Sequence, residues 1–158
     1  MAGFLDLPGV GTVFIKRVDV PGWIQGIIDR IRGSRASRSL RGAAMLSARG
    51  LAHPEPMAAM DVIERGAVRA SYLISQSLDR ADSLSRFALG PGEIKGRDVR
   101  RRKAISDTVA REVRRLHDSG LYTRDLQETN IMVEEHGARA FKVYFIDLED
   151  VRRTPVVS

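Results

Sequence analysis

Two pairs of strand-like segments, each joined by a short turn, constrain the fold of this chain more than any other feature. The first pair is MAAMDVI (57–63) and VRASYLIS (68–75), and the turn between them is ERGA. The second pair is NIMVEE (130–135) and FKVYFID (141–147), and the turn between them is HGARA. Apolar runs rich in β-branched and aromatic residues, separated by a few turn residues, are typical of antiparallel hairpins. The sequence therefore predicts two hairpins far apart in the chain.

Other segments predict one more strand and three helices. TVFIKRV (12–18) follows the turn PGVG and predicts a strand in which Lys16 shares a face with Phe14 and Val18. Residues 22–32 predict a short helix, and small residues spaced three and four apart predict a second one, with Ser34 as its N-cap and its end near Gly50. A third, amphipathic helix ends before Gly120, and its apolar face holds Ile105, Val109, Val113 and Leu116. Residues 90–98 predict a loop from their Gly and Pro content, so the order of elements indicates an α+β fold.

Charge and composition narrow the class of protein. Lysine and arginine exceed aspartate and glutamate by 26 − 20 = +6, so the surface should attract anions such as phosphates, nucleic acid or acidic lipid headgroups. The chain has no cysteine, which excludes disulfides and thiolate metal sites, and its three histidines are scattered singly. No basic leader or long apolar segment is evident, so we expect a soluble, unsecreted protein.

Four polar residues occupy positions where a rigid scaffold places reactive groups. Lys16 lies within an apolar strand, Asp125 and Asn130 lie in the loop RDLQETN, and Asp147 ends the strand FKVYFID. Asn130 and Asp147 could supply oxygen ligands to Mg²⁺. Lys16 could neutralise phosphates, and Asp125 could orient or deprotonate an attacking hydroxyl. Each residue also has a plainer interpretation. Lys16 could be an edge residue that reaches water, the spacing of Asp125 and Asn130 could arise by chance, and Asp147 could lie where a strand runs into an acidic loop. Their order and settings together favour the kinase interpretation.

The motifs VFIKR, SYLIS, LHDSGLYTRDLQETNIMV and VYFIDLEDVRR resemble those of the lipopolysaccharide kinase (Kdo/WaaP) family, which has a protein kinase-like fold. The resemblance implies that Lys16 contacts ATP phosphates, that Asp125 is the catalytic aspartate, and that Asn130 and Asp147 bind Mg²⁺. It places Gln76 and Ser77 at the hinge beside adenine. The implied reaction is transfer of the γ-phosphoryl group of ATP to a sugar hydroxyl, in this family of Kdo or heptose in the lipid A core.

The sequence departs from the kinase pattern at several positions. Thr123 stands where His is common, Leu148 and Glu149 replace the Phe and Gly that follow the metal-binding Asp, and the glycine loop is reduced to PGVG. The helix expected to offer a glutamate to Lys16 has no acid between Arg30 and Leu51. The chain ends 158 − 147 = 11 residues after Asp147. We therefore expect a two-lobed kinase-like fold, shortened at the glycine-rich loop and in the C-terminal lobe, with lobes at residues 1–75 and 76–158. A non-catalytic nucleotide-binding module and a small protein kinase are the alternative functions.

Two arginine-rich stretches allow more than one interpretation. They are Arg30, Arg32, Arg35, Arg38 and Arg41 in one region and KGRDVRRRK (95–103) in the other. The plain interpretation is a solvated helix face and an exposed loop, and the functional one is docking on anionic lipid A phosphates or an anionic membrane surface. Nucleic acid is disfavoured because aromatic residues are not interleaved with the arginines. The resemblance thus implies a cytoplasmic protein that binds peripherally at the inner face of the inner membrane.

Overall fold

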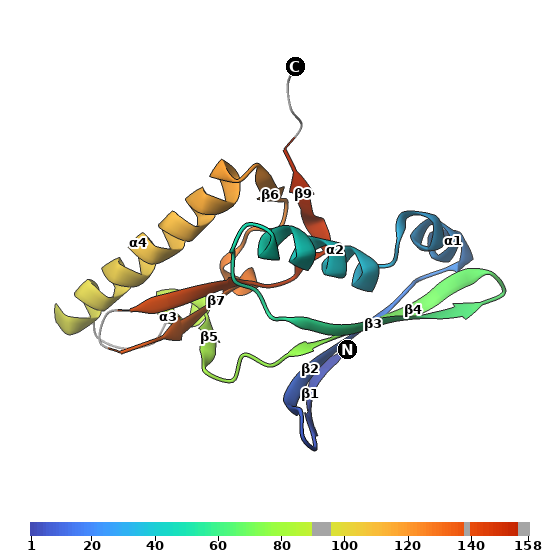
Figure 1. The fold of residues 1–158 in the computed structure, drawn as a ribbon, viewed down its shortest axis with the longest axis horizontal. Helices are drawn as coiled ribbons and strands as arrows, with labels where there is room; N and C mark the ends of the chain where they lie inside the picture. The colour runs from blue at the N-terminus through green and yellow to red at the C-terminus, as the bar shows by residue number, and fades with distance from the viewer. Residues whose placement is uncertain (90–95, 138–139, 155–158) are drawn as a thin grey trace. The chain divides into compact units, whose positions relative to one another are not determined.

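The computed structural model describes residues 1–89, 96–137 and 140–154 (Figure 1). The chain forms two compact units. Unit 1 comprises Met1–Met45, Pro54–Ser77 and Leu148–Asp150, and unit 2 comprises Leu46–His53 and the described residues of Leu78–Asp147 and Val151–Ser158. The elements in chain order are β1 (Ala2–Leu7), β2 (Gly11–Asp19), α1 (Trp23–Arg32), α2 (Arg35–Ser47), β3 (Pro56–Glu64), β4 (Ala67–Gln76), β5 (Ala81–Ser83), α3 (Leu84–Leu89), α4 (Gly96–Asp118), β6 (Leu121–Thr123), the 3₁₀-helix η1 (Glu128–Asn130), β7 (Ile131–Glu135), β8 (Phe141–Phe145), the 3₁₀-helix η2 (Leu148–Asp150) and β9 (Val151–Arg153).

A four-stranded antiparallel sheet forms the base of unit 1. Its strand order is β1-β2-β4-β3, so the predicted strand at 12–18 and the predicted hairpin at 57–75 are confirmed. The sequence had not predicted β1, which pairs with β2 from Ala2 opposite Lys16 to Leu7 opposite Gly11. PGVG is the turn between these two strands, and both of its glycines have positive φ (78° and 93°), which other residues adopt only with strain.

Helices α1 and α2 lie on one face of this sheet (Figure 1). Both were predicted, and the Ser34 cap is present, since the Ser37 backbone N–H donates to Ser34 Oγ at 3.2 Å. α1 contacts β4 through Gly26, where an added Cβ would lie 2.4 Å from the Val68 carbonyl oxygen. The two backbones therefore approach too closely for any side chain at this position.

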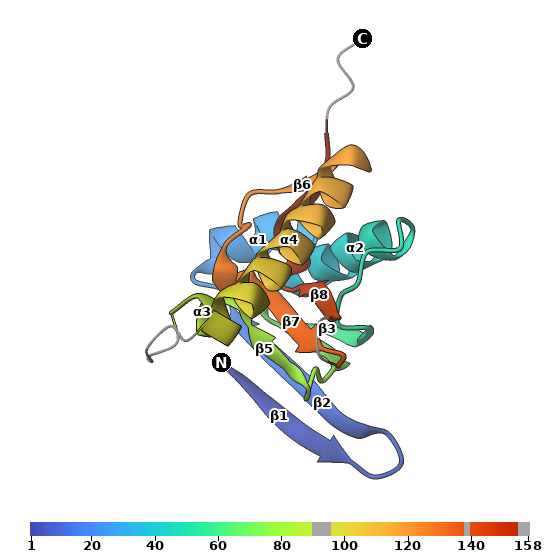
Figure 2. The same ribbon diagram turned by 90° about the vertical axis from the view of Figure 1, so that its left-hand side faces the viewer.

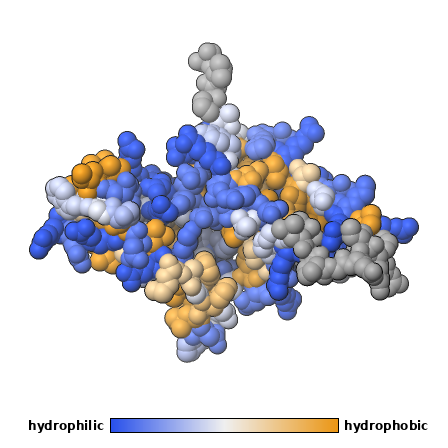
Figure 3. All heavy atoms as spheres, turned by 180° about the vertical axis from the view of Figure 1, so that it is seen from behind, coloured by the Kyte–Doolittle hydropathy of each residue, from blue (hydrophilic) through white to orange (hydrophobic). Residues whose placement is uncertain are grey.

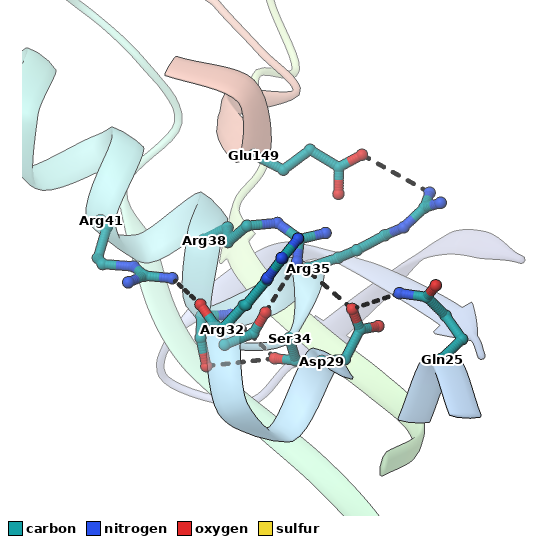
Figure 4. A network of polar contacts seen from close by, with 10 residues as sticks. Gln25, Asp29, Arg32, Ser34, Arg35, Arg38, Arg41 and Glu149 are labelled. Atoms are coloured by element: carbon teal, nitrogen blue, oxygen red, sulfur yellow. Dashed lines mark hydrogen bonds and ion pairs between the residues drawn. The ribbon is translucent and has the colours of Figure 1, made fainter. Parts of the chain in front are cut away.

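The corner between α1 and α2 is held by a polar network (Figure 4). Asp29 is only 4% exposed, accepts a hydrogen bond from Gln25 Nε2 at 2.9 Å and pairs with Arg38 at 3.5 Å. Arg38 also donates to the Gly33 carbonyl, and Arg41 donates to the Arg32 carbonyl, both at 2.8 Å. Arg38 is half-buried and Arg41 is exposed, and both side chains bind carbonyls at or just after the end of α1, where backbone acceptors lack partners within the helix.

Unit 2 combines a three-stranded sheet of order β5-β7-β8 with the two-stranded sheet β6-β9. The predicted hairpin at 130–147 is confirmed as β7 and β8, which pair from Ile131 opposite Phe145 to Glu135 opposite Phe141. Helix α4 packs against β8 (Figure 2), and the buried apolar side chains of the unit include Ile105, Leu116, Leu121, Ile131, Val133, Val143 and Phe145. Strand β7 therefore contributes Ile131 and Val133 to the core of this unit.

The predicted loop at 90–98 is wrong over 96–98, because α4 begins at Gly96. The remainder of that prediction, 90–95, lies outside the described residues, as do residues 138–139 of the HGARA turn. One glycine costs a helix about 1 kcal/mol, which a helix of 23 residues offsets through the hydrogen bonds and packing that follow. Among the described residues, no helix has the length and apolar character that a membrane span requires.

Candidate functional site

The loop RDLQETN lies in unit 2 between strand β6 and strand β7. β6 ends at Thr123, whose Oγ1 accepts a hydrogen bond from the Asp125 backbone N–H at 3.3 Å. η1 then carries the chain to Asn130, and the buried Ile131 begins β7. Both ends of the loop are thus anchored by strands, while Asp125 lies between them.

The Asp125 carboxylate is held by two side-chain amides. Asn130 Nδ2 donates to Asp125 Oδ2 at 2.9 Å and to the Asp125 carbonyl at 3.1 Å, and Gln127 Nε2 donates to Asp125 Oδ1. Sequence reasoning had singled out Asp125 and Asn130 but missed Gln127. The only feature of the sequence that could have identified Gln127 is its position two residues after Asp125. The two amides fix the orientation of the carboxylate and leave lone pairs on both oxygens to accept further hydrogen bonds.

Asp147 lies at the same end of the β7–β8 ribbon as Asn130. Ile131 pairs with Phe145, and beyond that pair the Ile146 N–H donates to the Asn130 carbonyl at 3.0 Å. Asp147 is the next residue, and its φ of 57° is in the left-handed region that a non-glycine residue rarely adopts. Such strained backbone conformations cluster at functional sites. The structure therefore brings Asp125, Asn130 and Asp147 to one end of unit 2.

These residues fit the requirements of Mg²⁺. Asn130 uses its Nδ2 to hold Asp125, which leaves its Oδ1 to face an ion, and Asp147 supplies a carboxylate. Mg²⁺ commonly takes one or two protein oxygens and completes its shell with water and phosphate oxygens. Among the described residues no three acids or histidines gather to make a larger cage.

Lys16 belongs to unit 1, and it lines a small cavity on the helix-covered face of the sheet. Its partner in register is Leu73, and two residues along the sheet Val18 pairs with Ser71. The cavity has a volume of about 10 Å³, close to the space of a single water, and its lining is Lys16, Val18, Arg35, Ala36, Ser39, Ser71, Leu73 and Glu149. Ser71 is 1% exposed, and its Oγ has no hydrogen-bond partner among the described residues. Lys16 therefore extends from the sheet toward helix α2.

Glu149 brings a negative charge to this cavity from a distant part of the sequence. Its Oε1 lies 3.6 Å from Arg35 Nη1 at the start of α2, and the two side chains face each other in Figure 4. The cavity thus has two cations, Lys16 and Arg35, and one anion. The glutamate expected on the helix is absent, and an acid of η2 occupies the surroundings of Lys16 instead. Sequence reasoning had noted Glu149 only as a departure from the kinase pattern.

The segment that contains Glu149 is packed tightly on α2. A Cβ added at Gly42 would lie 2.2 Å from the Leu148 carbonyl oxygen and 2.9 Å from Leu148 Cβ. Leu148 itself is buried, at 7% exposure. Only glycine allows this approach, so the residue that follows Asp147 rests on the helix backbone.

The two proposed hinge residues lie where the chain leaves unit 1. Gln76 is the last residue of β4, and its N–H donates to the Glu55 carbonyl at 2.8 Å. The Ser77 N–H donates to the Thr12 carbonyl at 3.2 Å, and Leu78 begins unit 2. The backbone of the connection is therefore fixed on the side of unit 1.

Comparisons with known proteins agree on one family and one fold. Residues 30–156 match the family described as the lipopolysaccharide kinase (Kdo/WaaP) family. The structure of WaaP in complex with acyl carrier protein is similar with a TM-score of 0.67 and 19% identity, over 98% of this chain and 60% of that one. A co-crystal structure of WbdD with a kinase inhibitor is similar with a TM-score of 0.55 and 18% identity, over 92% of this chain and 30% of that one. No curated protein sequence matches the chain. The chain thus has the kinase-like fold and spans about three fifths of the length of WaaP.

Proposed function

Because this chain belongs to the lipopolysaccharide kinase (Kdo/WaaP) family, we propose that it transfers the γ-phosphoryl group of ATP to a sugar hydroxyl of the lipopolysaccharide core, Kdo or heptose. One observation carries the proposal. The Asp125 carboxylate is oriented by Gln127 and Asn130 at the end of the ribbon that leads to Asp147. A fixed carboxylate beside two oxygen donors is the arrangement that phosphoryl transfer to a hydroxyl requires.

In this proposal Asp125 acts on the acceptor hydroxyl. The oxygen of the sugar forms a bond to the γ-phosphorus, the bond from that phosphorus to the bridging oxygen of ADP breaks, and the hydroxyl proton passes to Asp125. Gln127 and Asn130 position this carboxylate through their hydrogen bonds, and Asn130 is also one of the two proposed Mg²⁺ ligands. General-base assistance of this kind contributes about 10²- to 10⁴-fold to the rate.

The remaining proposed residues bind the nucleotide. Asn130 and Asp147 would hold Mg²⁺, which supplies charge neutralisation for the phosphates. Lys16 contacts the phosphates, and Gln76 and Ser77 lie beside adenine. We assign residues 1–75 to the sheet-based lobe and residues 76–158 to the lobe that carries the catalytic loop.

Glu149 takes the place of the missing helix acid in this proposal. It shares the cavity of Lys16 and pairs with Arg35, so it holds η2 to the start of α2 and keeps a negative charge near the lysine. Exchanging the two charges, by Arg35→Glu with Glu149→Arg, should restore more nucleotide affinity than either single change retains. If the double variant binds nucleotide no more tightly than the weaker of the two single variants, the pair does not have this role.

The experiment that tests the proposed function compares two isosteric changes in the same loop. Asp125→Asn should lower phosphotransfer to a lipopolysaccharide core oligosaccharide by about 10²-fold or more while the protein still binds ATP and Mg²⁺. Glu128→Gln is the matched control, because Glu128 is an exposed acid three residues away. Equal turnover by both variants would contradict the assignment.

A second candidate, a non-catalytic nucleotide-binding module, is favoured by the absence of an acid from α2. Its signature would be stabilisation by ATP and Mg²⁺ without phosphate transfer to any core oligosaccharide. Transfer to Ser or Thr of a protein substrate would instead identify a small protein kinase. For the sugar kinase we propose a cytoplasmic location at the inner face of the inner membrane, where its acceptor is a lipid A precursor.

A further inference from the structure

Helix α1 packs against unit 1 with its small and polar side and exposes its apolar side. Its buried residues are Gly26 and Asp29. Trp23, Ile24 and Ile31 are 53%, 72% and 79% exposed. A helix that covers a sheet normally does the opposite, with its apolar stripe facing the core. The outward apolar side therefore calls for a partner outside the unit.

The exposed Trp23, Ile24 and Ile31 form one continuous stripe with the half-buried Ile27 and Ile28. At about 100° per residue, Trp23, Ile24, Ile27, Ile28 and Ile31 fall within one arc of α1, and Gly26 and Asp29 fall on the opposite side. We call these five residues the α1 stripe. Figure 3 shows apolar atoms among hydrophilic ones on the side where α1 lies. The stripe spans two turns and so presents a surface rather than an isolated residue.

Cations flank the α1 stripe on both sides. In the same projection Arg30 falls beside Trp23 and Arg32 falls beside Ile28, and both arginines are exposed. Arg30 Nη1 also donates to the Gly66 carbonyl at 3.0 Å, which brings the neighbouring exposed Arg65 close to α1. Within α1, which is described in full, the one acid is the buried Asp29.

Other exposed apolar groups of unit 1 have acids beside them instead. On β1, Phe4 and Leu5 are followed by the exposed Asp6. On β3, the exposed Met60, Val62 and Ile63 alternate with Asp61 and Glu64, which are also exposed. Of these three apolar surfaces, the α1 stripe is the one whose charges suit an anionic partner.

We propose that the α1 stripe binds the surface of an anionic lipid bilayer, with its isoleucines and Trp23 among the headgroups and upper acyl chains and with Arg30 and Arg32 on lipid phosphates. Interfacial helices have this composition, with apolar and aromatic residues on one side and arginine or lysine along its borders. Tryptophan prefers the boundary between headgroups and acyl chains.

This inference extends the membrane part of the proposed function but depends on α1 alone. Binding to vesicles is measured without ATP or an acceptor sugar, so its failure and the failure of phosphotransfer are separate results. Trp23 is the single tryptophan of the chain, and its emission reports directly on the environment of the stripe.

The test uses the full chain with vesicles of phosphatidylcholine alone or with 30% phosphatidylglycerol. With the anionic vesicles we expect a blue shift of Trp23 emission, protection from an aqueous quencher and co-flotation of the protein, all weakened by salt. Ile24→Asn with Ile31→Asn, and separately Arg30→Gln with Arg32→Gln, should each weaken binding by about tenfold or more. Met57→Ser with Met60→Ser, on β3, is the control and should bind as the wild type does.

Three results would overturn the proposal. The first is no emission shift and no flotation with anionic vesicles, and the second is equal binding by the Ile24/Ile31 variant. The third is self-association that the Ile24/Ile31 variant abolishes while vesicles have no effect, since a second copy of the chain would then cover the stripe. Unchanged melting temperatures of the variants establish that they remain folded.

Discussion

Gly42→Ala isolates the contact between helix α2 and the residue that follows Asp147. The backbone at Gly42 is helical and accepts alanine, so only the neighbouring atoms oppose the change. An added Cβ would lie 2.2 Å from the Leu148 carbonyl oxygen, whereas ordinary contact begins at 3.4 Å. The segment must therefore move by about 3.4 − 2.2 = 1.2 Å, and because the obstacle is backbone, no side-chain rotation relieves it.

Two opposing terms set the effect on stability. Overpacking costs about 1–3 kcal/mol, and a backbone obstacle favours the upper part of that range. Alanine in place of glycine returns about 1 kcal/mol through helix propensity. The expected net destabilisation is thus about 2 kcal/mol, seen as a lower urea midpoint with an unchanged slope.

Gly42→Ala should also weaken the response to ligand. Leu148 is bonded to Asp147, the proposed metal ligand, so moving Leu148 by about 1.2 Å would also displace the backbone of Asp147. We therefore expect Gly42→Ala to lose most of the thermal stabilisation by ATP and Mg²⁺ at temperatures where the variant is folded. Gly3→Ala is the control, because nothing lies within 4 Å of its added Cβ. A Gly42→Ala protein that is as stable as the wild type or more so, with an unchanged nucleotide response, would refute the close contact.

Three further predictions concern single residues. Ser34→Ala removes the N-cap of α2 and should lower the free energy of unfolding by about 1 kcal/mol in urea titrations. Tyr144 Oη donates to Glu134 at 2.6 Å, and this hydrogen bond is the main cause that lowers the pKa of Glu134. A lowered carboxyl pKa stabilises the fold above the unfolded pKa and loses that contribution as pH falls, so Tyr144→Phe should cost about 1 kcal/mol near pH 7 and progressively less below about pH 4. Asp147→Gly should be about 1 kcal/mol more stable than Asp147→Ala in the same titrations, because glycine accepts positive φ, and a reversed order would contradict the strain at this position.

The elements with local signals were predictable from the sequence. The hairpins at 57–75 and 130–147, the Ser34 cap and the apolar face of α4 each depend on residues close together in the chain. Strand β1 was not predicted, because all but one of its residues are exposed and no alternation between a buried and an exposed face marks it. β6 and β9 have three residues each and pair Leu121 with Arg153, so neither their length nor their partner is visible locally.

The site was predictable to a similar extent. Asp125 and Asn130 follow a known spacing, and their contact through Nδ2 agrees with it, although their chemical roles stay predictions. Glu149 and Gly42 could not have been assigned to a shared structure, because their relation to Leu148 and Arg35 depends on tertiary packing between residues more than 100 positions apart. A clue was nevertheless present. Helix α2 has several arginines and no acid, so its charges are balanced by anions from elsewhere in the chain, and η2 has two consecutive acids, Glu149 and Asp150.

Asp147 lies between two backbone segments, and each segment is held by contacts within its own unit. On one side the Ile146 N–H is bonded to the Asn130 carbonyl within unit 2. On the other side Leu148 rests on Gly42 within unit 1, and Glu149 is paired with Arg35 there. The φ of 57° at Asp147 is a left-handed conformation in which aspartate, asparagine and histidine are enriched among non-glycine residues. If Asp147 is the Mg²⁺ ligand that we propose, this backbone conformation sets the direction in which its carboxylate leaves the chain, which favours a site that is formed before the nucleotide binds.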